Sequence, residues 1–197
     1  EAKLNGARLD ELYRQGAIES DVEFLEYKLL FNIFNNNNEI GTGDFEVVLK
    51  ETKRKNKIEW LKVLEMISGV QNAKYEVQEV GPVIANSVLK NKFNVYQTYF
   101  VCQYLINWGF TTEPYLLLSK FARQKNLFPK LYKQYVKLGY FLQQFDNKRE
   151  WKKLRTVLGT LAEKYPNDLC DLFKWNQMGV RALENKEVAK IFCETCN

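Results

Sequence analysis

Apolar residues recur along this chain at steps of three and four, the spacing that puts them on one face of a helix. The clearest example begins at residue 20, where Ser20 and Glu23 have the spacing of a capping box. An apolar stripe follows them, formed by Phe24, Tyr27, Leu30, Phe31 and Phe34. The pattern predicts a helix over residues 20–34, which the asparagine run at 35–38 ends.

The same periodicity predicts further helices along the rest of the chain. Gly109 is placed to end one of them, Pro82 to restart one and Pro129 to open another. The predicted ranges are 44–54, 58–67, 82–89, 93–108, 112–126, 129–145, 151–165, 168–178 and 186–193. An alternating stretch at 75–80 hints at a strand, but no other segment offers it a partner.

These elements predict an all-α fold, with antiparallel helical hairpins stacked as an irregular helical repeat or a bundle. We expect a single domain over residues 1–197, with a subdivision near 110–114 as the alternative. The segment from Phe93 to Trp108 is apolar on nearly every side, which is typical of a helix covered on several faces. Phe100 and Leu105 should therefore be almost fully buried, and Leu105→Ala should cost about 2–5 kcal/mol.

Composition and charge narrow the class of protein. Hydrophobic residues make up 46% of the 197 residues and charged residues 27%, the balance of a globular protein. The net charge of +5 permits an acidic partner without requiring one. The sequence shows no charged segment followed by an apolar one, as a leader would have, and no window approaches ~18 uncharged apolar residues. We expect no signal peptide, no membrane association and an intracellular location, nuclear or cytoplasmic.

The residues for common catalytic chemistry are missing. The chain has no His, which removes the commonest general base and the usual zinc ligand. We therefore expect no enzymatic activity, no cofactor, no metal and no small-molecule substrate. Four cysteines, at positions 102, 170, 193 and 196, are predicted to be reduced thiols. Cys193 and Cys196 form a C-x-x-C, interpreted as core or terminus, with half of a metal site as the alternative.

Two basic runs are the candidate contacts for nucleic acid or another acidic partner. The first consists of Lys50, Lys53, Arg54, Lys55 and Lys57, and the second of Lys148, Arg149, Lys152, Lys153 and Arg155. Each run can also be a solvated face, and the first would suit the negative end of a helix dipole. In the second run, Lys148, Lys152 and Arg155 share one predicted helical face. Trp151 lies among them and could stack on a base or enter the core.

Several helix motifs resemble one known family. Residues 12–13 and the run Glu23-Phe24-Leu25-Glu26-Tyr27-Lys28-Leu29-Leu30 look like the E-F-x-x-Y-x-L-L helix of GANP-type mRNA-export scaffolds. Residues 85–89, with 94–96 and 99–100, are similar to that family's small-residue helix and the N-Y-x-x-F-F that follows it. Residues 115–118 and 120–122 resemble the next helix. The resemblance covers residues 4–122 and implies a PCI-type helical repeat that acts as a scaffold in nuclear mRNA processing or export.

The leading hypothesis is therefore a non-catalytic helical scaffold or adaptor that holds other proteins of a larger complex, or RNA. The alternative is an RNA-binding helical repeat of the TPR or pentatricopeptide kind, from an organelle or a virus. Reversing the charges of Lys148, Lys152 and Arg155 should leave the fold intact and weaken binding of an acidic partner.

Overall fold

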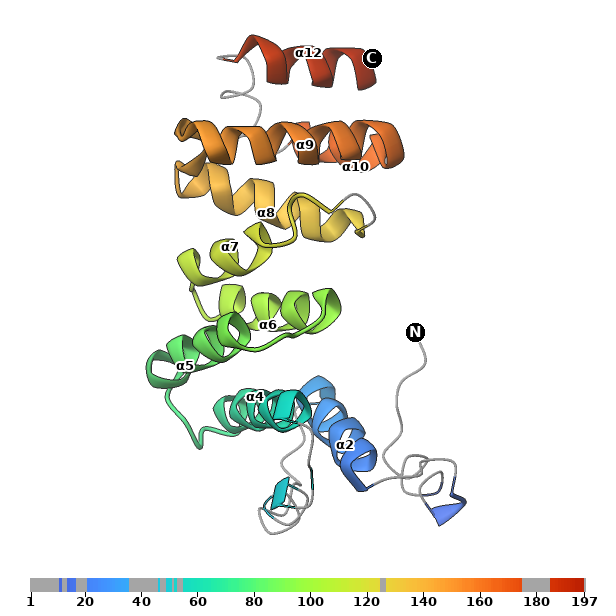
Figure 1. The fold of residues 1–197 in the computed structure, drawn as a ribbon, viewed down its shortest axis with the longest axis vertical. Helices are drawn as coiled ribbons and strands as arrows, with labels where there is room; N and C mark the ends of the chain where they lie inside the picture. The colour runs from blue at the N-terminus through green and yellow to red at the C-terminus, as the bar shows by residue number, and fades with distance from the viewer. Residues whose placement is uncertain are drawn as a thin grey trace. The chain divides into compact units, whose positions relative to one another are not determined.

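The structure is a computed structural model that describes residues 11, 14–16, 21–35, 46, 49–50, 52, 55–124, 127–174 and 185–196. Within these ranges every regular element is a helix and none is a strand, which confirms the prediction of an all-α chain. The chain has two compact units, of which unit 1 ends at Asn94 and unit 2 begins at Val95 (Figure 1). The turn near 110–114 lies inside unit 2, between two helices that pack on each other.

Unit 1 is organised around α4 (Lys55–Gln71), which packs against both α2 (Asp21–Asn35) and α5 (Val77–Lys90). Leu61, Leu64 and Ile67 of α4 are fully buried, as the three-residue spacing predicted. The Trp60 indole donates a hydrogen bond of 2.7 Å to Oε1 of Glu26, which ties α4 to α2. Of the predicted helix over 44–54, only residues 46, 49, 50 and 52 belong to the described part of the chain, and the capping residue Ser20 lies outside it.

The buried face of α2 differs from the predicted one. Leu25, Leu29 and Ile33 are buried, whereas Tyr27 and Phe34 of the predicted stripe are exposed. The other predicted members, Phe24, Leu30 and Phe31, are half-buried. The helix has an aliphatic stripe beside its aromatic one, and the smaller side chains allow the closer approach to α4. The predicted helical periodicity is confirmed, but the stripe that was predicted to be buried is the wrong one.

Around α5, the weak hint of a strand is not realised, and the prediction for Pro82 is wrong. Residues 75–80 form no strand, because α5 already begins at Val77. Pro82 lies inside this helix instead of opening it. Val80, Ile84 and Val88 form a buried stripe that begins before the exposed proline and continues after it, so packing against α4 offsets the loss of one backbone hydrogen bond.

Unit 2 opens with α6 (Val95–Asn107) and α7 (Thr112–Ser119), which pack on each other. Gly109 ends the first of them as predicted, with a φ of 90° that a residue without a Cβ adopts freely. Leu105 is fully buried as predicted, but Phe100 is only half-buried, so the prediction for Phe100 is wrong. Phe100 instead packs against Tyr104 along the helix, with the two rings tilted by 52° and their centroids 5.0 Å apart.

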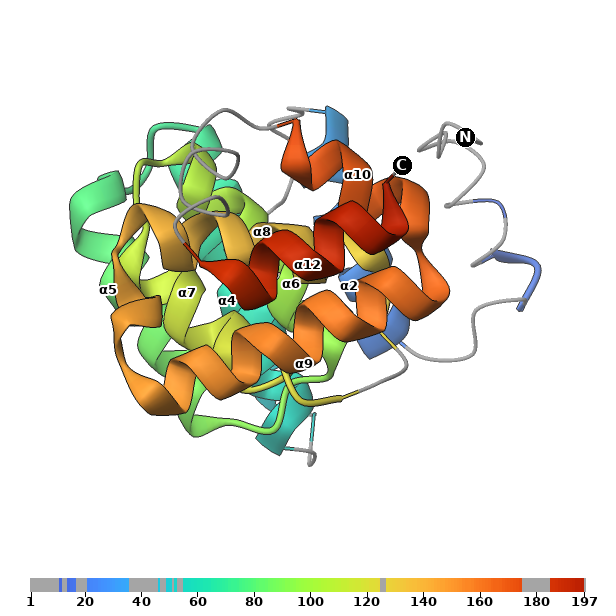
Figure 2. The same ribbon diagram turned by 90° about the horizontal axis from the view of Figure 1, so that it is seen from above.

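The remaining helices of unit 2 are α8 (Pro129–Phe141), α9 (Lys148–Lys164), α10 (Pro166–Phe173) and α12 (Lys186–Thr195), with a short 3-10 helix, η1 (Gln144–Asp146), after α8. Pro129 opens α8 and the residues before Pro166 end α9, both as predicted. The structure ends α7 and α10 earlier than the sequence suggested. Helices α8 and α9 run in opposite directions, and α12 runs alongside α9 in the same direction (Figures 1 and 2). The first turns of α9 and α12 therefore lie at the end where α8 finishes.

No helix in the part of the chain that the structure describes is both long and apolar enough to cross a bilayer.

Candidate functional site

The first basic run does not form a described cluster. Lys50 is exposed, Lys53 and Arg54 lie outside the described residues, and of Lys55 only the backbone is described. Lys57 forms an ion pair with Glu26 of α2, and burial lowers the pKa of its amine. Because α4 begins at Lys55, Lys55 and Lys57 stand at the positive end of a helix dipole, opposite to the placement that the sequence suggested.

The second basic run lies on α9, and the amphipathic sequence of this helix decides where each side chain points. Asn147 caps the helix, and its side-chain oxygen accepts a hydrogen bond of 2.8 Å from the backbone N–H of Arg149. The inner face is apolar and fully buried, and consists of Leu154, Val157, Leu158 and Leu161. Lys148, Arg149 and Lys152 are exposed on the outer side.

Lys153 turns inward, so it is not offered to a partner. Its side chain is buried, and Nζ donates a hydrogen bond of 2.7 Å to Oε1 of Glu150. The other oxygen of Glu150 accepts hydrogen bonds from the hydroxyls of Tyr115, at 2.6 Å, and Tyr135, at 3.2 Å. The rings of these tyrosines stack with centroids 5.4 Å apart. Glu150 thus joins α7, α8 and α9, and the network has a structural role.

The network shifts the pKa values of its members. Burial pushes the pKa of Glu150 upward, but the hydrogen bonds from Lys153 and Tyr115 outweigh it, so the net pKa is lowered. Burial and the neighbouring carboxylate raise the pKa values of Tyr115 and Tyr135. At neutral pH the arrangement is therefore a carboxylate that receives hydrogen bonds from two neutral phenols and one ammonium group.

Arg155 is also engaged within the protein. Its Nε lies 3.3 Å from Oε2 of Glu187 on α12, and both side chains are more than half exposed. An exposed pair of this kind contributes little to stability, and an anionic partner could displace it. The structure therefore separates Arg155 from the cations at the start of α9.

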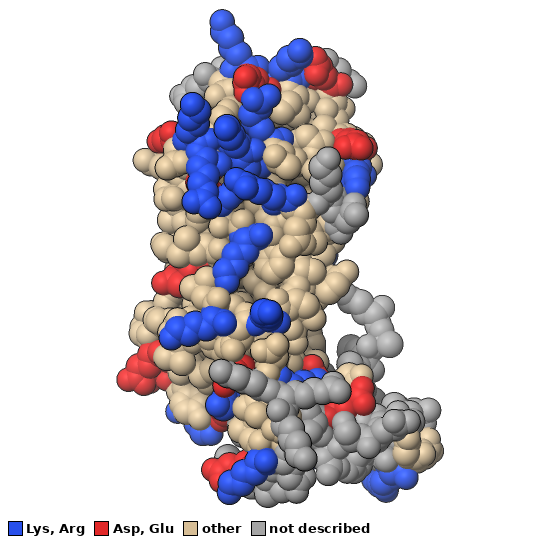
Figure 3. All heavy atoms as spheres, viewed as in Figure 1, with Lys and Arg blue, Asp and Glu red and all other residues tan. Residues whose placement is uncertain are grey.

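Those cations line an open hollow of about 570 Å³, which we call the basic hollow. It is lined by Arg123, Asn147, Lys148, Arg149 and Lys152. In the space-filling view, basic side chains gather densely over α9 (Figure 3). None of its four cations forms an ion pair with any carboxylate that the structure describes. Neighbouring like charges without counter-charges raise the energy of the folded protein, and a bound anion would lower it.

The helix dipole does not explain this placement. Lys148 and Arg149 occupy the first turn of α9, where the backbone N–H groups already carry partial positive charge. Cations there are unfavourable for the helix, whereas an anion would be favoured by both the side chains and the helix end. The arrangement suits binding of an anion better than it suits folding.

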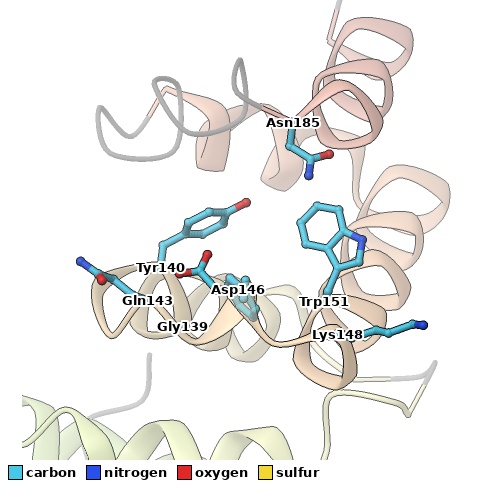
Figure 4. A pocket seen from close by; sticks show the side chains of 8 residues that line it. Gly139, Tyr140, Gln143, Asp146, Lys148, Trp151 and Asn185 are labelled. Atoms are coloured by element: carbon cyan, nitrogen blue, oxygen red, sulfur yellow. The ribbon is translucent and has the colours of Figure 1, made fainter.

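A second recess, of about 740 Å³, adjoins the basic hollow, and we call it the aromatic pocket. It is lined by Gly139, Tyr140, Gln143, Phe145, Asp146, Lys148, Trp151 and Asn185. These residues come from the end of α8, from η1, from the first turn of α9 and from the start of α12 (Figure 4). Lys148, in the first turn of α9, lines both recesses.

The packing of the pocket depends on Gly139. A Cβ at this position would lie 2.2 Å from Cζ of Phe145, so only glycine lets that ring pack against α8. Phe145 is further held edge-on against Tyr135 and Tyr140, with centroid distances of 5.7 and 5.0 Å. The Phe145 side of the pocket is therefore rigidly packed.

The opposite side of the pocket is less occupied. The half-buried indole of Trp151 contacts no other aromatic ring in the described ranges. Asn185 uses its side-chain oxygen to cap α12, accepting from the N–H groups of Glu187 and Val188 at 3.1 and 3.3 Å. Its amide nitrogen and the carboxylate of Asp146 form no hydrogen bond or ion pair with the residues that the structure describes, and both face the recess (Figure 4).

Sequence reasoning found Lys148, Arg149, Lys152 and Trp151, and missed the rest of the site. Arg123, Tyr140, Asp146 and Asn185 lie on separate elements, and no spacing in the sequence connects them to α9. One sequence signal did indicate an anion site. Two cations directly follow the cap residue Asn147, and cations in the first turn are unfavourable for the helix itself.

The cysteines differ from the prediction of four reduced thiols. Cys170 and Cys196 form a disulfide, with their Cα atoms 5.5 Å apart. It joins α10 to the end of α12, which pack together although 26 residues separate the two cysteines in sequence. Cys102 is buried and Cys193 exposed as free thiols. Among the residues that can be placed, no group of three or more His, Cys, Asp or Glu side chains could hold a metal ion.

No protein-family model, curated protein or solved structure matches the chain.

Proposed function

We propose that the chain is a non-catalytic helical binding module that holds a phosphate-bearing partner at the basic hollow of unit 2. The observation that carries the proposal is the group of four cations, Arg123, Lys148, Arg149 and Lys152, that lack carboxylate partners within the described structure. Two of these are arginines, whose planar guanidinium groups bind phosphate oxygens in pairs. The partial positive charge at the start of α9 adds to the same attraction.

We extend the proposal to the role of the whole protein as a scaffold. The resemblance to GANP-type scaffolds supports a place among other proteins in mRNA processing or export, where RNA supplies the phosphates. Most motif residues of this resemblance fall on α2, α5, α6 and α7. The residues of the basic hollow come later in the sequence. An RNA-binding helical repeat of the TPR or pentatricopeptide kind is the second candidate, and the aromatic pocket next to the basic hollow favours it.

The test is the salt dependence of binding to a labelled single-stranded RNA of about a dozen nucleotides. The association constant should fall steeply as NaCl rises from about 50 to 200 mM, because phosphate contacts release counterions. Replacing Lys148, Arg149 and Lys152 together by Gln should weaken binding and reduce the slope of log K against log salt by about 0.7 for each lost contact.

The matched control removes the same charge elsewhere. Lys62, Lys90 and Lys92 are exposed on unit 1, and the triple change to Gln there should leave affinity and slope nearly unchanged. Equal weakening by both triple variants would show that net charge, and not the basic hollow, governs binding. Absence of binding to the wild-type chain at low salt would contradict the proposal.

A further inference from the structure

We propose that the aromatic pocket accepts one unstacked nucleobase of a single-stranded nucleic acid whose phosphates occupy the basic hollow. This inference rests on the proposed function and names its partner. The pocket volume of about 740 Å³ is in the range of small-molecule sites and leaves room for a base with its ribose.

The stacking surface is Trp151. A base needs an aromatic face that is not already covered, and the Trp151 indole contacts no other ring among the residues described. Phe145, in contrast, is enclosed between Tyr135 and Tyr140. Stacking on an aromatic side chain accepts any base, because every base has a π face.

The residue that the two recesses share fits the covalent structure of a nucleotide. Lys148 lines both recesses, and Trp151 lies three residues later, on the same side of α9. A phosphate bound at Lys148 therefore has its own base within reach of the indole. Arg149 and Lys152 continue the cationic surface for the neighbouring phosphates.

The polar groups of the pocket favour a base over an acidic peptide. The carboxylate of Asp146 accepts hydrogen bonds and would repel a Glu or Asp side chain. The amide nitrogen of Asn185 is held in place by the cap that its oxygen makes, and it donates. The edge of a nucleobase offers donors and acceptors together, so it can satisfy both groups.

The recess also favours a single strand over a duplex. A base inside a double helix would have to leave its stack and its pairing partner to enter the pocket, which costs free energy. A single strand already presents unstacked bases to aromatic side chains. We therefore expect single-stranded RNA to bind the full chain more tightly than a duplex with the same number of phosphates.

The experiment compares an oligonucleotide with an abasic oligomer that has the same sugar–phosphate backbone and length. The full chain should bind the oligonucleotide more tightly, by roughly five- to a hundredfold, and Trp151→Leu should remove most of this difference. Trp151→Phe should retain much of it, because a phenyl ring still stacks. Trp108→Leu is the matched control in unit 2 and should leave the difference intact, while thermal unfolding shows that each variant is folded.

Each outcome separates the two proposals. Equal affinity for both oligomers, unaffected by Trp151→Leu, would overturn the base pocket and leave the phosphate-binding function standing. Failure of either oligomer to bind at low salt would overturn both proposals. Tighter binding of a poly-glutamate chain of equal charge would also overturn the base pocket and indicate an acidic protein segment as the partner. Strong preference for the base-bearing oligomer, lost in Trp151→Leu, is the result we expect.

Discussion

At the scale of single residues, α9 shows how neighbours in sequence take different roles. Glu150 and Lys153 point into the unit and hold Tyr115 and Tyr135, whereas Arg149 and Lys152 point outward into the basic hollow. The two roles are physically separate, because the inward pair satisfies its charges and the outward cations do not. Substitutions can therefore test folding and binding one at a time.

Gly139→Ala tests the packing of the pocket. The new Cβ would lie 2.2 Å from the Phe145 ring, which is itself packed against two tyrosines, so the ring cannot move without loss. We expect a loss of about 1–3 kcal/mol in the free energy of unfolding, measured by urea denaturation. The control is Gly159→Ala on α9, where a Cβ meets nothing within 4 Å, and a gain of about 0.5–1 kcal/mol is expected. Equal effects of the two changes would contradict the close packing.

Glu150→Gln tests the buried network through its pH dependence. Because the folded pKa of Glu150 is lowered, its stabilisation is complete above the ordinary pKa of about 4.3 and is lost as the pH falls through the folded value. At pH 7 the variant should be less stable by about 1–3 kcal/mol, because Lys153 loses its counter-charge.

The difference between wild type and Glu150→Gln, measured by urea denaturation at a series of pH values, should shrink below about pH 4. Glu163→Gln, at an exposed position of the same helix, should change stability by less than about 0.5 kcal/mol at either pH. A difference that stays constant down to low pH would show that the carboxylate charge is unimportant.

At the scale of elements, the positive charge at the start of α9 has opposite effects on stability and on binding. Two cations, Lys148 and Arg149, stand in its first turn, where anions are preferred. Changing both to Glu should raise the free energy of unfolding by about 0.3–1 kcal/mol per charge at low salt, and should nevertheless weaken RNA binding. Urea denaturation and fluorescence anisotropy measure the two effects on the same samples.

A first-turn lysine outside the two recesses provides the control. Lys130→Glu, in the first turn of α8, should give a similar gain in stability with no loss of affinity. Destabilisation of the Lys148 and Arg149 variant by more than about 1 kcal/mol would mean that these cations have structural partners.

The elements themselves were largely predictable, and their contacts were not. Periodicity with Gly109, Pro129 and Pro166 located most helices, because those residues act on the backbone within one turn. The buried stripe of α2 was chosen wrongly, since two apolar stripes compete and only the partner helix decides between them. Residues such as Arg123 and Asn185 reach the site through packing between helices, which one sequence does not reveal. The disulfide escaped prediction for the same reason.

At the scale of the whole molecule, the division into two units places the candidate site entirely in one of them. All the described residues that line the basic hollow and the aromatic pocket lie between Arg123 and Asn185. The described helices of unit 2, α6 to α10 and α12, pack on one another around buried residues that include Leu105, Tyr135 and Leu158. Unit 2 therefore has a core of its own, which a domain needs to fold alone.

The fragment Val95–Asn197 tests this directly. Its helices should give a far-ultraviolet circular dichroism spectrum typical of α-helix and should unfold cooperatively, because the contacts of its core are internal. Its affinity for single-stranded RNA should agree with that of the full chain within about threefold, and its salt slope should be unchanged. Trp151→Leu should weaken the binding of the fragment as much as that of the full chain. A folded fragment that has lost RNA binding would show that residues of unit 1 contribute to the interface, which would then be larger than the two recesses on unit 2.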